Sequence, residues 1–138
     1  MDCPVDIVFV LDESGSINET DFSLMKSFLS QLVGGLDIDS GNTRVGLVTF
    51  ASNIGTRINL NVHASARSLQ SAISSLIQAT GGTNTAAALA YVRTMMLTSA
   101  TGDRSNVPNV VVVLTDGESN NATATQVRIK FRSCFLSE

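Results

Sequence analysis

The chain has 138 residues, of which 43% are hydrophobic and 15% are charged, and its formal net charge is −3. This length is typical of one domain, and the hydrophobic fraction is too high for a disordered chain. The mild acidity argues against a nucleic-acid partner, no apolar run approaches the roughly 20 residues of a membrane-spanning helix, and two cysteines cannot build a disulfide scaffold.

The first predicted elements are a strand and a helix. Residues 7–11 form a continuous apolar run that is mostly β-branched or aromatic, which favours a strand buried on both faces. Residues 18–36 place apolar side chains at helical spacing, and Asn18 or Thr20 can cap that helix.

The remaining elements continue the alternation of strands and helices. Residues 44–50 predict a second buried strand, and residues 54–60 predict an antiparallel edge strand beside it. Helical patterns over 64–76 and 86–97 follow, and the valine-rich run at 110–114 predicts a fourth strand. We therefore expect an α/β fold: a doubly wound, mostly parallel sheet with one antiparallel edge strand and helices on both faces. A helical bundle is disfavoured because the valine-rich runs are β-branched.

Oxygen-bearing side chains cluster in three predicted loops. Asp12, Ser14 and Ser16 follow the first strand, Asp116 follows the fourth, and two threonines stand in the glycine-rich loop at 81–85. Ligands of open α/β sheets bind beyond the carboxyl ends of the strands, so we expect these loops to meet at one edge. Oxygen ligands select Mg²⁺ or Mn²⁺ over zinc, and these loops contain no Cys or His. Taken singly, each loop could instead be an ordinary helix cap or turn.

Four segments in order resemble the von Willebrand factor type A domain family, which includes integrin I domains and the A modules of matrilins and matrix collagens. The segments are DIVFVLDESGSI at 6–17, RVGLVTF at 44–50, GGTNT at 81–85 and VVVLTDGES at 111–119. The resemblance implies a Rossmann-like fold that here lacks the final strand and helix. It assigns residues 1–126 to an incomplete domain and residues 127–138 to a divergent tail.

The resemblance also implies a metal-ion-dependent adhesion site. By position in the family motif, its ligands would be Asp12, Ser14, Ser16, Thr83 and Asp116. The implied cation is Mg²⁺, with Mn²⁺ or Ca²⁺ as substitutes, and one coordination position is left open for a partner's carboxylate. Glu13 and Glu118 are expected to be solvated side chains rather than ligands.

Two kinds of extracellular modification are implied or suggested. In many family members a cysteine before the first strand pairs with one after the last helix, which here would join Cys3 to Cys134. Asn18 and Asn121 each begin an N-glycosylation triplet, although such triplets also arise by chance.

The implied function is that of a secreted matrix or adhesion module, not an enzyme. Its partner would be an extracellular protein that presents Asp or Glu, such as collagen or another matrix protein. One alternative is a Mg²⁺-dependent phosphoryl-transfer enzyme with Asp12 as the nucleophile. That chemistry also needs a cation beside the phosphoryl oxygens, and neither Lys26 nor Lys130 follows a predicted strand. A second alternative is a truncated fragment that binds nothing.

Overall fold

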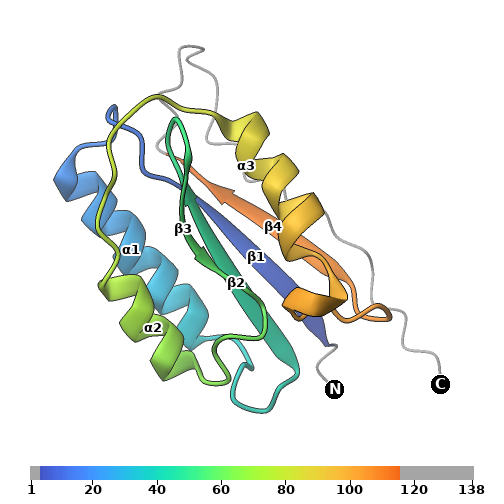
Figure 1. Cartoon of the computed structure of the whole chain (residues 1–138). Helices are drawn as coiled ribbons and strands as arrows, with labels where there is room; N and C mark the ends of the chain where they lie inside the picture. The colour runs from blue at the N-terminus through green and yellow to red at the C-terminus, as the bar shows by residue number, and fades with distance from the viewer. Residues whose placement is uncertain (1–3, 116–138) are drawn as a thin grey trace.

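The computed structural model describes residues 4–115, and they form one four-stranded sheet in the order β3-β2-β1-β4 (Figure 1). The strands are β1 (Val5–Asp12), β2 (Thr43–Phe50), β3 (Ile54–Ile58) and β4 (Asn109–Leu114). β1 pairs in parallel with β2 and with β4, whereas β3 pairs antiparallel to β2. The predicted mostly parallel sheet with one antiparallel edge strand is therefore confirmed.

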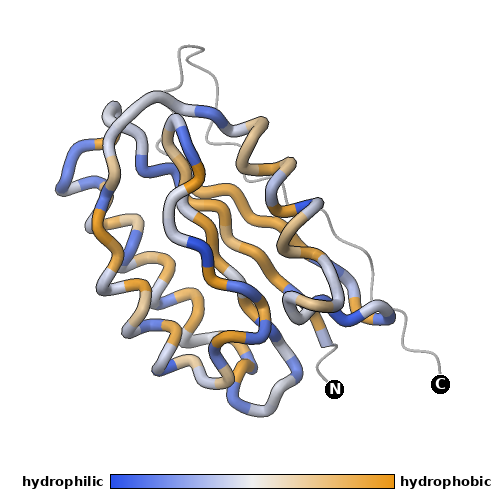
Figure 2. Tube along the Cα trace, in the orientation of Figure 1, coloured by the Kyte–Doolittle hydropathy of each residue, from blue (hydrophilic) through white to orange (hydrophobic). Residues whose placement is uncertain are grey.

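The central strand β1 is buried on both of its faces. Phe9 and Leu11 belong to the apolar cluster beneath α1 and α2, whereas Val8 and Val10 belong to the cluster beneath α3. Figure 1 shows α1 and α2 on one face of the sheet and α3 on the other, and Figure 2 shows that the central strands are strongly hydrophobic. Helices on both faces explain why the sequence of this strand shows no alternation of apolar and polar residues.

The helices α1 (Glu19–Gly34) and α2 (Ala66–Ser74) begin at side-chain caps. The Oδ1 atom of Asn18 accepts a hydrogen bond from the backbone N–H of Asp21 at 2.7 Å, so Asn18 is the cap, of the two candidates in the sequence. Ser65 caps α2 in the same way by accepting from the N–H of Ser68 at 3.2 Å. Both helices are shorter than the apolar spacing predicts.

The predicted helix over 86–97 is in fact two kinds of helix. It begins as α3 (Thr85–Tyr91), continues as the π-helical segment η1 (Val92–Met96), and is followed by the short 3₁₀ segment η2 (Ser99–Thr101). The N–H of Leu97 donates to the carbonyl of Val92 at 3.0 Å, which closes the wider turn. Val92 and Met96, the first and last residues of η1, are both buried. Apolar spacing alone cannot distinguish this wider turn from a continued α-helix.

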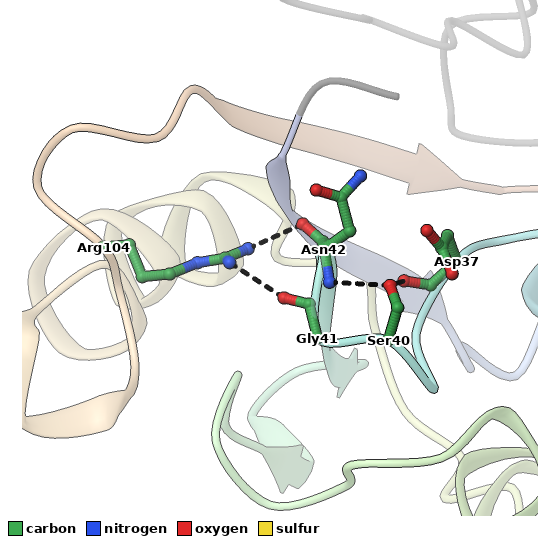
Figure 3. A pocket seen from close by; sticks show the side chains of 5 residues that line it. All are labelled: Asp37, Ser40, Gly41, Asn42 and Arg104. Carbon is green, nitrogen blue, oxygen red and sulfur yellow. Dashed lines mark hydrogen bonds between the residues drawn. The ribbon is translucent and has the colours of Figure 1, made fainter. Parts of the chain in front are cut away.

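At the amino end of β1, a buried ion pair fastens the loop that precedes β4. Asp6 has no exposed surface, and its carboxylate accepts hydrogen bonds from the Nη2 of Arg104 at 2.7 Å and from the Arg104 backbone N–H at 2.8 Å. The same guanidinium donates to the carbonyls of Gly41 and Asn42 (Figure 3). A polar pocket of about 420 Å³ lies here, lined by Asp37, Ser40, Gly41, Asn42 and Arg104. The pocket lies at the amino ends of the parallel strands, opposite the loops that follow their carboxyl ends.

Two further predictions concern the rest of the chain. The predicted domain boundary at residue 126 and the predicted lack of the family's final strand and helix both concern residues outside those described. Among residues 4–115, no helix is long and apolar enough to cross a membrane.

Candidate metal centre

Asp12 ends β1 with its carboxylate held from two sides. It is 2% exposed, and its Oδ1 accepts from the N–H of Ser14 at 2.9 Å. Its Oδ2 accepts from the hydroxyl of Thr115, also at 2.9 Å. Thr115 directly follows β4, the neighbour of β1, which explains how a residue 103 positions away reaches this carboxylate. Each carboxylate oxygen keeps a second lone pair that can bind a cation.

Ser14 and Ser16 lie beside Asp12 in the loop that follows β1. Their hydroxyl oxygens are 3.1 Å apart, and Ser14 is buried whereas Ser16 is exposed. Between them, the N–H of Gly15 donates to the carbonyl of Gly81 at 3.0 Å. The structure thus brings the three predicted ligands of this loop together and joins the loop to the glycine-rich segment.

Thr83 is exposed in the loop that leads into α3. The loop is fixed by its neighbours, since Gly82 N–H donates to the Oγ of Ser52 at 2.6 Å and Asn84 N–H donates to the carbonyl of Ala51 at 2.9 Å. Thr83 stands two residues after Gly81, the point at which this segment meets the Ser14–Ser16 loop. In the described part of the chain, no hydrogen bond joins its hydroxyl to Asp12, Ser14 or Ser16.

The second predicted carboxylate, Asp116, lies just outside the described residues. The same holds for Glu118, for both cysteines of the implied disulfide, Cys3 and Cys134, and for the sequon at Asn121. The sequon asparagine Asn18 is exposed at the start of α1, where its side chain also caps that helix.

The expectation that Glu13 is a solvated side chain is wrong. Glu13 is 2% exposed, and its Oε2 accepts a hydrogen bond from the N–H of Ala79 at 3.2 Å. Its Oε1 lies over Gly55 of β3, in space that a Cβ at that position would occupy. The Glu13 carboxylate can occupy this buried space because Gly55 has no side chain. The sequence could not predict this contact between Glu13 and Gly55, because it depends on how β3 pairs with β2.

The donor atoms gathered here fit a hard divalent cation. They are carboxylate and hydroxyl oxygens, and within residues 4–115 no group of three His, Cys, Asp or Glu side chains competes with them. Hydroxyls and one carboxylate compensate only half of a divalent charge, which suits a cation that keeps waters or accepts a further carboxylate. Thr115 was not among the predicted site residues, and its signal in the sequence is its place directly before Asp116 at the end of a buried strand.

Comparisons with known proteins agree with this architecture. The family model described as "von Willebrand factor type A domain" matches residues 6–133. Matrilin-1 of Mus musculus is 38% identical over 122 residues, which is 86% of this chain and 24% of that protein. The collagen alpha-4(VI) chain of Mus musculus is 39% identical over 120 residues, which is 86% of this chain and 5% of that protein. The chain therefore spans a quarter or less of the length of these relatives.

Solved structures give the same result for the fold. Proximal thread matrix protein 1 from the mussel byssus matches with a TM-score of 0.79 and 28% identity, over 89% of this chain and 33% of that one. A further structure of that protein, with a TM-score of 0.78, is described as having a zinc-occupied MIDAS motif. A divalent metal thus occupies the motif in a structurally similar protein. By sequence and by fold, the chain belongs to the von Willebrand factor type A domain family.

Proposed function

We propose that this chain is an extracellular protein-binding module that acts through a divalent cation. The proposed ligands are Asp12, Ser14, Ser16, Thr83 and Asp116. The observation that carries the proposal is the hydrogen-bonded set of Asp12, Ser14 and Ser16 at the carboxyl end of the central strand. That a collagen chain and a byssal thread matrix protein are among the similar proteins supports a matrix setting.

The described residues prepare the site for a cation before it binds. The two hydrogen bonds to Asp12 fix the direction of its remaining lone pairs, so little conformational freedom is lost on binding. When bound, the cation would supply a Lewis-acidic position to which a partner's Asp or Glu can bind. The proposed partner is therefore collagen or another matrix protein with such an exposed side chain.

Mg²⁺ is the proposed cation because the donors are all oxygens. Mn²⁺ and Ca²⁺ remain substitutes to compare, and the zinc in the byssal protein adds Zn²⁺ to the comparison. A secreted location, glycans at Asn18 and Asn121, and the Cys3–Cys134 disulfide belong to the same proposal. Intact-mass measurement of the secreted protein, before and after reduction and deglycosylation, tests these modifications.

The deciding experiment is thermal denaturation of the chain in EDTA and in increasing Mg²⁺. A cation that binds the folded state adds about 2.7 kcal/mol of stability at 100 times its dissociation constant, so the melting temperature should rise. Asp12→Ala should abolish this rise. Asp37→Ala, at the opposite edge of the sheet, is the matched control and should keep it. No rise with any of the four cations would instead favour a fragment that binds nothing.

A phosphoryl-transfer enzyme is less well supported by the described contacts. Both oxygens of Asp12 accept hydrogen bonds, and two cationic side chains are engaged elsewhere. Lys26 donates to the carbonyls of Ser74 and Leu76, and Arg104 is paired with Asp6. Turnover of an aryl phosphate that is lost in Asp12→Ala would reverse this preference.

A further inference from the structure

A second hydrogen-bonded layer lies directly behind the proposed ligands and joins two loops that are far apart in the sequence. From the segment that follows α2, the Nε2 of Gln78 donates to the carbonyl of Ile17 at 2.7 Å and to that of Ser14 at 3.2 Å. The next residue, Ala79, donates its N–H to the carboxylate of Glu13. These contacts connect the Ser14–Ser16 loop to the segment that runs on to Thr83.

Glu13 is held on its other side by the β2–β3 hairpin. Its backbone N–H donates to the carbonyl of Phe50 at 2.9 Å. Its side chain lies over Gly55, beside the hydroxyl of Thr49, which itself accepts from the N–H of Thr56 at 2.7 Å. Three segments therefore meet at this one side chain: the loop after β1, the hairpin, and the segment after α2.

Burial of Glu13 is costly, because a carboxylate loses its hydration when it is buried. Within residues 4–115, the only ion pair is that between Arg104 and Asp6, so no side-chain cation in this part of the chain pairs with Glu13. An apolar side chain in the same space would avoid the cost. What the carboxylate adds is an acceptor for Ala79, which ties the second loop to the first.

We propose that Glu13 and Gln78 are positioning residues for the cation site. They hold the hydroxyls of Ser14 and Ser16 at a fixed place relative to the Thr83 segment before any cation binds. The inference rests on the proposed metal-dependent function, because it assigns no ligand and adds only the residues that orient the ligands. Loss of the partners that orient metal ligands commonly weakens metal affinity about 10- to 100-fold.

The test compares Glu13→Ala with Glu13→Gln by Mg²⁺ titration calorimetry of the whole chain, at a temperature where all variants are folded. Glu13→Ala should weaken Mg²⁺ binding by about 10-fold or more. Glu13→Gln should bind like the unmodified chain, since its amide oxygen still accepts from Ala79. Equal weakening in both variants would show that the charge of Glu13 matters and would overturn the positioning role.

A measurement without metal gives an independent readout. In EDTA, the amide protons of Gly15 and Ala79 should exchange faster in Glu13→Ala than in the unmodified chain or in Glu13→Gln. Ile38→Val, buried beside the amino-end pocket and therefore at the other end of the parallel strands, lowers stability and should change neither these amides nor Mg²⁺ affinity. If Glu13→Ala does not fold, Gln78→Ala removes the same loop connection from the other side.

Asp12→Ala distinguishes failure of this inference from failure of the proposed function. If Asp12→Ala abolishes Mg²⁺ binding while Glu13→Ala and Gln78→Ala bind normally, the positioning role is wrong and the metal site stands. If the unmodified chain binds none of the four cations, the proposed function fails and this inference fails with it.

Discussion

Both oxygens of the Asp12 carboxylate accept hydrogen bonds within the described structure, one from the Ser14 backbone and one from the Thr115 hydroxyl. A side chain that is 2% exposed depends on such partners, because an unpaired buried carboxylate would lose its hydration without replacement. Thr115 therefore contributes to both stability and site geometry, although it was not among the predicted ligands.

Thr115→Val removes the hydroxyl while keeping the shape of the side chain. We expect a loss of about 1–3 kcal/mol in the free energy of unfolding in EDTA, because Asp12 loses a hydrogen bond where it is buried. Mg²⁺ affinity should also fall, by about 10-fold. Urea denaturation and titration calorimetry measure the two effects. Thr94→Val, whose hydroxyl bonds only within its own helical segment, is the control and should leave Mg²⁺ affinity unchanged.

At the scale of the elements, the carboxyl end of β1 distributes its acidic side chains to two different environments. Asp12 is bonded to residues that follow β1 and β4, whereas Glu13 is bonded to the segment after α2 and covered by β3. The β2–β3 hairpin thus forms part of the buried region around Glu13, in addition to providing the edge strand β3.

Gly55→Ala tests the contact between β3 and Glu13. The added Cβ would collide with the Glu13 carboxylate and the Thr49 hydroxyl, so we expect a loss of about 1–3 kcal/mol in unfolding free energy. In a Glu13→Ala background the same change should cost less, since one of the two colliding groups is gone. A double-mutant cycle by urea denaturation measures the difference. Gly35→Ala, where a Cβ meets only a carbonyl at 3.6 Å, is the control. Additive costs would contradict the contact.

At the scale of the whole molecule, the carboxyl ends and the amino ends of the parallel strands carry different polar clusters. The loop at the carboxyl end of β1 brings together Asp12, Ser14 and Ser16, three of the proposed ligands. The amino ends carry the buried Asp6–Arg104 pair, beside the pocket that Figure 3 shows. This pair joins residues 98 positions apart and closes the loop before β4 onto β1. Substitutions at the amino ends are therefore expected to change stability without changing cation binding.

Arg104→Ala should lower the free energy of unfolding by about 3–5 kcal/mol, because Asp6 would stay buried without its partner. Among variants folded at low temperature, Mg²⁺ affinity should not change, since the pair is at the opposite edge from Asp12. Denaturation in EDTA and calorimetry check the two expectations. The exposed Arg93→Ala is the control, with a change within about 0.5 kcal/mol. A large loss of Mg²⁺ affinity in Arg104→Ala would refute the separation of the two edges.

Local pattern in the sequence was enough to determine the strands, the mostly parallel sheet with its antiparallel edge strand, and a side-chain cap at the start of α1, for which Asn18 and Thr20 were the two candidates. Burial on both faces produces unbroken apolar runs, and a helix end needs a side-chain acceptor, so both leave a signal within a few residues. The clustering of Asp12, Ser14 and Ser16 was predictable for the same reason, since the three lie within five residues of one another.

Only the tertiary structure decided the partners that are distant in sequence. The burial of Glu13 depends on a glycine in β3, the second hydrogen bond of Asp12 depends on Thr115 after β4, and Asp6 depends on Arg104. The π-helical segment after α3, which buries Val92 and Met96, was likewise not predictable from apolar spacing. The spacing of apolar residues predicts which face of its own helix or strand a side chain lies on. It does not predict which distant residue that side chain contacts, because strand order and register determine the contact.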